Sequence, residues 1–145
     1  MSLGWALIST GLHVDHTIAP AITATPDAEL VATCSRDQAR AEACAQKHGA
    51  QAAYSDLGAL LRDSRVDAVF IASPNALHAR HALQAAHAGK HVFSEKPMTT
   101  TLEDAVAMVR TCRDRGVKLG VGYHLRQHPG LRQARRLIGE GVWCR

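Results

Sequence analysis

The stretch VDAVFIASPNALHARHALQAAHAGKHVFSEKP, residues 66–97, contains the pattern that decides the fold. Its first eight residues form a nearly continuous apolar run, which predicts a strand buried on both faces. Residues 75–90 follow with the pattern of a helix that begins at an Asn cap and ends near a glycine. HVFSE, residues 91–95, predicts the next strand. A strand, a helix and a strand in this order predict two parallel strands joined by a helical crossover.

The same alternation runs through the rest of the chain. Further strands are predicted at 5–9, 29–35, 52–55 and 117–123, and further helices at 13–24, 37–49, 56–63, 101–116 and 129–141. Pro20 predicts a bend in the first of these helices. Thr101, with an acid three residues later, is typical of a helix start with a capping box. We therefore predict a Rossmann-type α/β fold, with a doubly wound, mainly parallel sheet and helices on both faces.

Length and composition are those of one ordinary domain. The 145 residues are 46% hydrophobic and 21% charged. No apolar run approaches the length of about 20 residues that a membrane span needs. The N-terminus has no basic region followed by an apolar segment, so we predict neither a secretory signal nor a membrane partner.

Cysteine and histidine spacing argues against disulfides and metal. The four cysteines show none of the short paired intervals of a disulfide framework or zinc site, which favours a reducing, cytoplasmic location. Cys34 lies in an apolar strand pattern and is predicted to be a small core residue. His78 and His81 are three residues apart, but no Asp, Glu or Cys joins them at ligand spacing, so we predict no metal site.

The net charge is positive and has two readings. A charge of +4 suits an anionic ligand such as a phosphate, and it equally suits an ordinary soluble surface. The basic residues are scattered apart from four near the end, Arg126, Arg132, Arg135 and Arg136. We interpret these four as the solvent-facing side of a helix, with Leu131 and Ile138 on the other side. Since aromatic residues are only 4%, we predict no nucleic-acid partner.

Polar clusters follow five of the predicted strands. They lie at residues 9–13, 35–37, 73–78, 95–98 and 123–126. In a parallel sheet of this kind, ligands bind beyond the carboxyl ends of the strands. The positions of these clusters therefore predict a ligand site at that edge of the sheet.

The first cluster, STGLHV at residues 9–14, is an altered form of the dinucleotide fingerprint G-x-G-x-x-G. Gly11 holds the middle position, where the absence of a side chain lets a pyrophosphate approach the backbone. Ser9 stands at the first glycine position. Val14 stands at the third, where its size should push the helix out slightly. We assign the turn from Ser9 to His13 to cofactor binding, with a plain strand-to-helix turn as the alternative.

The second cluster bears on the choice of cofactor. An NAD site usually places an acid at the end of the second strand, to hold the ribose 2′-hydroxyl. Here Ser35 and Arg36 come first, and Asp37 is typical of a helix cap. A guanidinium cannot accept from a hydroxyl, but it can hold a 2′-phosphate or stack on adenine. We therefore favour NADP(H) and keep NAD(H) as the second choice; the alternative is a solvated Arg36 beside a capping Asp37.

The third and fourth clusters are SPNALH and EKP. Pro74 ends the strand, Asn75 starts the next helix, and His78 lies one turn further on the same helix end. Lys96 precedes Pro97, which biases its backbone to an extended geometry, stops the strand and directs the side chain into the crevice. A cis bond between these two residues is compatible with the sequence. The alternative for Lys96 is a surface lysine in a turn.

These motifs resemble a known family. LISTGLHVDHTIAPAI, VDAVFIASPNALH, AGKHVFSEKP and GVGYHLRQHP, in this order, are similar to the N-terminal half of the glucose–fructose oxidoreductase and inositol dehydrogenase family (Gfo/Idh/MocA). The resemblance covers Leu3 to about Gly141. The altered glycine fingerprint is the part that departs from the family pattern.

The resemblance implies an NAD(P)-dependent oxidoreductase that transfers hydride between nicotinamide and a sugar, cyclitol or related polyol. It implies a catalytic role for Lys96, near the nicotinamide and the reacting hydroxyl, where it relays the proton. Glu95 and Pro97 would shape the turn, and Arg126 would lie on the substrate side. The full set of candidate cofactor-binding residues is Ser9, Thr10, Gly11, Leu12, His13, Ser35, Arg36, Ser73, Pro74, Asn75, His78, Glu95, Lys96 and Arg126.

The resemblance also sets the expected domain organisation. Residues 1–125 correspond to the NAD(P)-binding Rossmann domain, and residues 126–145 to the start of a connecting helix toward a second, substrate-binding domain. We expect the chain alone to bind dinucleotide with little or no dehydrogenase activity, and a second copy of the chain is a candidate partner. Two alternative functions remain: an NAD-using glycoside hydrolase of the same family, and a non-catalytic nucleotide-binding module.

Overall fold

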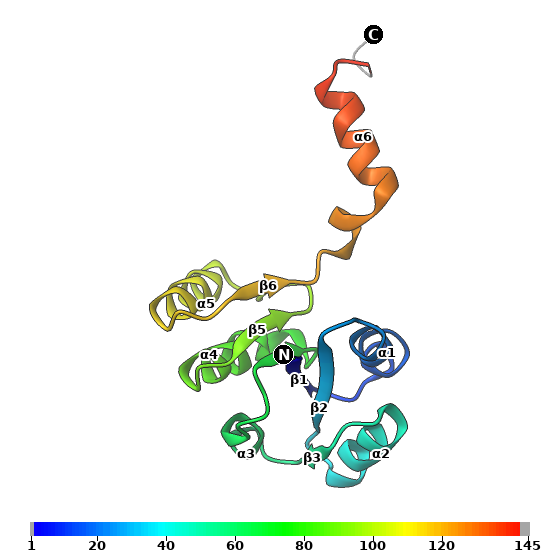
Figure 1. Ribbon diagram of the computed structural model, residues 1–145. Coiled ribbons are helices and arrows are strands. Elements are labelled where there is room, and N and C mark those ends of the chain that lie inside the picture. The colour runs from blue at the N-terminus through cyan, green and yellow to red at the C-terminus, as the bar shows by residue number, and fades with distance from the viewer. Residues whose placement is uncertain (1, 143–145) are drawn as a thin grey trace.

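A six-stranded sheet forms the centre of the computed structural model, which describes residues 2–142 (Figure 1). The strands are β1 (Leu3–Ile8), β2 (Ala28–Cys34), β3 (Ala52–Tyr54), β4 (Ala68–Ile71), β5 (His91–Ser94) and β6 (Leu119–Val121). All neighbouring pairs are parallel, in the order β3-β2-β1-β4-β5-β6. The strand order reverses between β1 and β4, and folds of this type bind ligands at that switch point.

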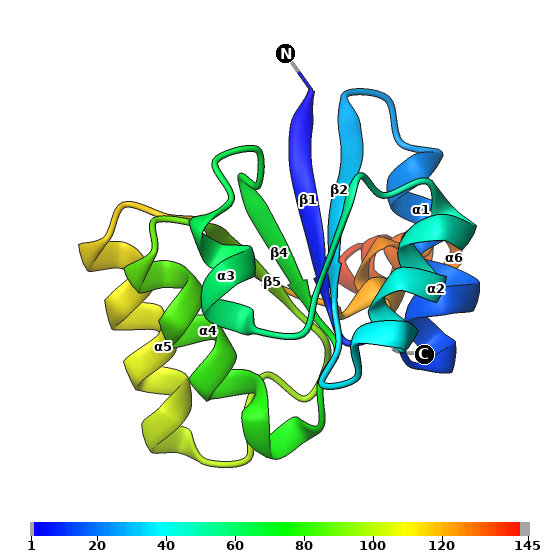
Figure 2. The same cartoon turned by 90° about the horizontal axis from the view of Figure 1, so that it is seen from below.

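Helices cover both faces of the sheet, so the predicted Rossmann-type fold is confirmed. Figure 2 shows α1 (Ala19–Thr23) and α2 (Gln38–His48) on one side of the strands. It shows α3 (Leu57–Arg62), α4 (His78–His87) and α5 (Leu102–Asp114) on the other side. The last helix, α6 (Pro129–Gly139), follows a 3-10 turn at His124–Gln127.

The apolar core lies on both faces because alternate residues of a strand point to opposite sides. In β1, Ala6 and Ile8 belong to the cluster under α3, α4 and α5, whereas Leu7 belongs to the cluster under α1. All four residues of β4 are buried, as the apolar run at residues 66–73 predicts. The sheet edge that carries the strand ends is therefore held on a rigid, close-packed base.

Two helix starts follow the predicted capping chemistry. The side chain of Asp37 accepts a hydrogen bond from the backbone N–H of Arg40 at the start of α2. The hydroxyl of Thr101 accepts from the N–H of Asp104 at the start of α5. In each case the side chain satisfies a backbone donor that the first turn leaves without an intrahelical partner.

The predicted Asn cap at Asn75 is wrong. Pro74 is the residue that precedes the turn, and Asn75–Leu77 form a 3-10 turn before α4 begins at His78. The N–H of Leu77 donates to the Pro74 carbonyl at 2.8 Å. This backbone bond takes the place of a side-chain cap, because it satisfies the N–H of Leu77 at the start of the turn.

The first helix also differs from its predicted form. Its helical residues begin at Leu12, continue as a π-helical turn at Val14–Ile18 and become α-helical at Ala19. Pro20 lies inside this continuous helical run, where its missing N–H leaves one bond of the ladder unmade. The irregularity therefore takes the form of a change in helix type just before the proline.

The C-terminal helix α6 extends away from the sheet (Figure 1). Leu131 and Ile138 are 49% and 57% exposed, so the apolar side of this helix also faces solvent. Arg126 lies in the preceding 3-10 turn, so the interpretation that placed it on the same helix as the three later arginines is wrong.

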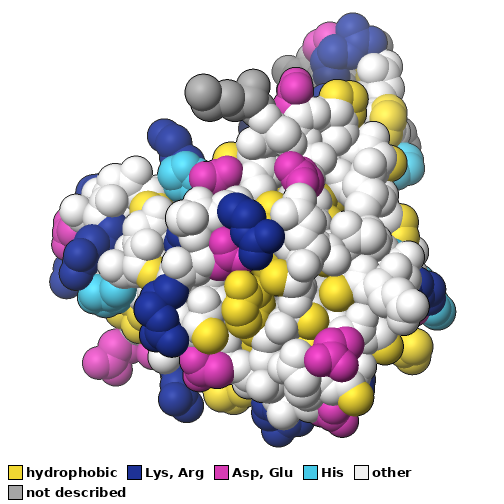
Figure 3. Space-filling model, turned by 60° about the horizontal axis from the view of Figure 1, so that its bottom comes forward, with side chains coloured by type: hydrophobic (Ala, Val, Ile, Leu, Met, Phe, Trp, Pro, Cys, Tyr) yellow, Lys and Arg dark blue, Asp and Glu magenta, His cyan; other side chains and the backbone are white. Residues whose placement is uncertain are grey.

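Three cysteines are free and buried, and Cys144 lies outside the described residues. Burial, reinforced by the charge of Asp56, raises the pKa of Cys34 to about 11, which fits the predicted core role. Within residues 2–142 no helix is long and apolar enough to cross a membrane, and no group of three or more metal-ligating side chains comes together. On the face shown in Figure 3, acidic and basic side chains are interspersed.

Candidate dinucleotide site

A cavity of about 480 Å³ lies at the carboxyl ends of the strands, around the switch point. It brings together three of the five predicted clusters: the turn after β1, the segment after β2 and the segment after β4. The predicted residues that line it are Ser9, Thr10, Gly11, Ser35, Arg36, Ser73 and Pro74. Residues of different clusters, 24 to 65 positions apart along the chain, thus meet in one crevice because their strands are parallel neighbours.

The turn after β1 keeps the backbone shape of a glycine-rich phosphate loop. Ser9 has a φ of 105°, in the region that normally requires glycine. Its N–H donates to the Cys34 carbonyl at 2.9 Å, which ties the turn to β2. A side chain at Gly11 would meet only the Ser9 hydroxyl, at 3.9 Å, so the space above this glycine is open to a ligand. Val14 is buried in the core under α1.

The end of β2 gives the cavity a basic wall. Arg36 and Arg40 both line it, together with Ser35 and Ser55. The Asp37 carboxylate lines it too, but it is engaged in capping α2. Sequence reasoning missed Arg40; the signal was available, because one helical turn from an N-cap brings a side chain back toward the loop.

Helix α4, which follows β4, contributes one histidine to the cavity wall and buries another inside the protein. His81 lines the cavity, and its Nδ1 lies 3.0 Å from the Ser73 hydroxyl. Burial, and secondarily the positive charges of Arg80 and His78, lower the pKa of His81. His78 is only 1% exposed and does not line the cavity. Asn75 is exposed and also lies outside the cavity wall.

The EKP turn after β5 is joined to the turn after β1. Glu95 Oε2 accepts from the backbone N–H of Lys96 at 2.9 Å, and Glu95 Oε1 lies 3.0 Å from His13 Nε2. The Lys96–Pro97 bond is cis. The Lys96 side chain is exposed at the end of the strand, and Leu12 is 77% exposed on the neighbouring turn.

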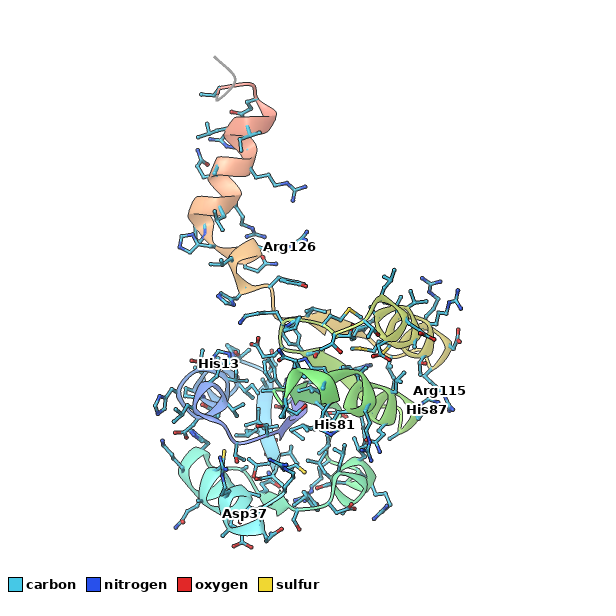
Figure 4. The ribbon with its side chains drawn as sticks, turned by 180° about the vertical axis from the view of Figure 1, so that it is seen from behind. His13, Asp37, His81, His87, Arg115 and Arg126 are labelled. Atoms are coloured by element: carbon cyan, nitrogen blue, oxygen red, sulfur yellow. The ribbon has the colours of Figure 1, made fainter. Side chains whose placement is uncertain are left out.

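A second, apolar cavity of about 890 Å³ begins beside this turn. Phe70 and Phe93 stack in it with their ring centres 5.4 Å apart. His13, Glu95 and Arg126 line its polar end. Figure 4 shows Arg126 on the segment that leads from the sheet toward α6. Ten of the fourteen predicted residues therefore line one or the other of these two cavities. The remaining four, Leu12, Asn75, His78 and Lys96, line neither, so the prediction that the Lys96 side chain enters the crevice is wrong.

The fold and the glycine turn at the switch point define a Rossmann-type dinucleotide-binding domain. Residues 3–123 match the sequence profile GFO_IDH_MocA, described as an oxidoreductase family with an NAD-binding Rossmann fold. The chain belongs to this family.

Similar proteins include several sugar oxidoreductases. The chain is 39% identical over 137 residues to 1,5-anhydro-D-fructose reductase from Ensifer adhaerens, covering 94% of this chain and 41% of that protein. It is 40% identical over 130 residues to D-xylose 1-dehydrogenase (NADP(+)) 2 from Haloferax volcanii, covering 90% and 39%. A 3-ketoreductase from Actinomadura kijaniata, solved with NADP, superposes with a TM-score of 0.92 at 32% identity, covering 98% and 45%. The chain thus spans less than half the length of these relatives.

Proposed function

We propose that the chain is the cofactor-binding half of an oxidoreductase and binds NADP(H) in preference to NAD(H). The observation that carries this proposal is the cavity at the switch point, with an open glycine turn at one end and two arginines at the other. The turn provides backbone amides for a pyrophosphate. Arg36 and Arg40 provide a doubly cationic site for a 2′-phosphate. NADP in the solved ketoreductase and in the name of the Haloferax relative supports the same choice.

The proposed reaction is hydride transfer to or from a sugar, cyclitol or related polyol. The nicotinamide ring, when bound, supplies the hydride acceptor or donor. Lys96 takes the proton from the substrate hydroxyl as the carbon is oxidised, and returns it in the reductive direction. Glu95 holds the backbone of this lysine through its carboxylate, and Arg126 offers a positive charge at the mouth of the second cavity.

We also propose that residues 1–125 form the cofactor domain and that residues 126–145 begin a connection to a substrate domain. The exposed apolar side of α6 supports this division, because such a side is normally buried against another element. The relatives, which are more than twice as long, are consistent with it. Substrate specificity then depends mainly on residues beyond this chain.

The test of cofactor choice is a calorimetric titration with NADPH and then with NADH. Wild-type chain should bind NADPH more tightly. Arg36→Ala and Arg40→Ala should each weaken NADPH binding about tenfold or more, because each loses a charge-assisted bond to phosphate. Neither change should alter NADH affinity by more than about threefold, since NADH has no 2′-phosphate.

Arg62→Ala is the matched control. Arg62 is an exposed arginine on α3, outside the switch-point cavity, so its loss changes net charge by the same amount. It should leave the NADPH affinity unchanged. Equal weakening by Arg62→Ala would show that the effects of Arg36→Ala and Arg40→Ala come from net charge alone. Equal affinity of the wild-type chain for both cofactors would overturn the NADP(H) preference.

A further inference from the structure

We propose that His78 is a positioning residue, which holds the EKP turn against the end of β4 and thereby places Lys96. The inference rests on the proposed function, because it assigns His78 a role only if Lys96 acts beside the nicotinamide. The family resemblance led us to expect His78 in the wall of the cofactor pocket, whereas the structure places its ring inside the protein.

The ring bridges the ends of two adjacent strands. β4 and β5 are paired up to Ile71 and Ser94, and the chain leaves the sheet just beyond this pair. His78 Nε2 lies 2.7 Å from the Ser73 carbonyl, on the β4 side. His78 Nδ1 lies 2.8 Å from the Pro97 carbonyl, on the β5 side. One buried side chain therefore fixes the distance between the segment that follows β4 and the segment that follows β5, which contains Lys96.

Glu95 is held by Ile71 and His13, and beyond it this bridge is the polar anchor of residues 96–100. Within the described chain, residues 96–100 make one hydrogen bond to a segment outside 94–101, and it is the bond to His78. Lys96 N–H is held by Glu95, which is its own neighbour. Met98 adds only an apolar contact with the core. Without His78, Glu95 would keep its backbone bond to Ile71, but residues 96–100 would lose their hydrogen bond to the segment that follows β4.

The chemistry of the two contacts makes the ring hard to replace. Both partners are carbonyl oxygens, which only accept hydrogen bonds. A neutral imidazole donates to one carbonyl at a time, and an imidazolium donates to both. An amide side chain such as Gln can donate to one of them, whereas Leu fills much of the volume and donates to neither.

The experiment measures the acylation rate of each lysine by mass spectrometry, with and without NADPH. Lys96 is exposed and should react readily in the free chain. NADPH at about ten times its Kd leaves about a tenth of the chain free, so labelling of Lys96 in wild type should slow about tenfold. Lys118, which is exposed at the opposite edge of the sheet, serves as the internal reference and should be unaffected.

The variants separate positioning from general stability. His78→Leu should retain NADPH affinity within about threefold, because the arginines and the glycine turn are untouched. It should nevertheless reduce the protection of Lys96 to about twofold or less. His78→Gln, whose donors lie on a single nitrogen, should give intermediate protection, and it takes the place of His78→Leu if the latter does not fold. Leu60→Ala, a core change in α3, should lower stability and keep full protection.

Each contrary result has its own meaning. Failure of wild type to bind NADPH would overturn the proposed function, and this inference with it. Binding without protection of Lys96 would overturn the placement of Lys96 beside the cofactor. Full protection in wild type and equally in both His78 variants would overturn the positioning role alone. Loss of protection in Leu60→Ala would show that loosening of the whole domain is sufficient, and would also overturn it.

Discussion

At the scale of single residues, Ser9 shows how this chain departs from a familiar turn while keeping its shape. The fingerprint has glycine at this position because the backbone there takes a positive φ. Ser9 adopts the same conformation with a side chain attached, at φ 105°. Local strain of this kind typically costs about 1–3 kcal/mol and is found at functional sites.

Ser9→Gly should therefore stabilise the chain. The change removes the strain but adds unfolded-state entropy, and we expect a net gain of about 1 kcal/mol in the free energy of unfolding. Urea denaturation of the two proteins measures this difference. Ser9→Ala is the control, since it removes the hydroxyl and leaves the strained conformation. A Ser9→Gly variant no more stable than Ser9→Ala would contradict the explanation.

At the scale of elements, ion pairs connect the helices that surround the turn. Asp15, one residue into the π-helical turn, lies 2.7 Å from Lys47 Nζ and 2.7 Å from His48 Nε2 at the end of α2. The hydrogen bond from Lys47, followed by that from His48, lowers the pKa of Asp15 to about 2. The carboxylate side chain is 22% exposed, so part of this interaction is screened by solvent and salt.

The lowered pKa of Asp15 predicts a pH dependence. Because the folded pKa of about 2 lies below the ordinary aspartate pKa of 3.8, the stabilisation is fully present above pH 3.8. It should be lost as the pH falls from about 4 through 2. Urea midpoints over this range should fall less steeply for Asp15→Asn than for wild type. Asp63, whose pKa is lowered chiefly by Arg65, remains in both proteins and cancels in the comparison. Identical slopes would show that the pair adds nothing.

Regular elements were predictable from the sequence because they depend on local signals. The apolar run of β4 and the caps at Asp37 and Thr101 follow from neighbouring residues alone. The 3-10 turn at Asn75 was not predicted, because a backbone bond competed with the side-chain cap. The burial of His78 was not predictable either, because its second partner, Pro97, is 19 positions away in the turn that follows another strand.

At the scale of the whole molecule, α6 stands apart from the sheet and its helices (Figure 1). Its principal contacts are with the 3-10 turn that precedes it. We therefore expect the segment beyond the proposed boundary near residue 125 to stabilise the sheet and its helices little.

Removal of residues 126–145 should leave the fold intact. We expect the free energy of unfolding to change by no more than about 0.5 kcal/mol, because few core contacts are lost. The NADPH affinity should change little, since the switch-point cavity contains none of these residues. Thermal unfolding and a repeated titration measure both quantities. A large loss of stability would place the C-terminal segment inside the domain and refute the boundary.

The central claim is that a dinucleotide binds at the carboxyl ends of the strands, and hydrogen–deuterium exchange with and without saturating NADPH tests it most directly. The account predicts slower exchange at residues 9–14 and 35–40, and no change in α5. Protection on the outer faces of α3 and α4, or no protection by a cofactor that calorimetry shows to be bound, would contradict it.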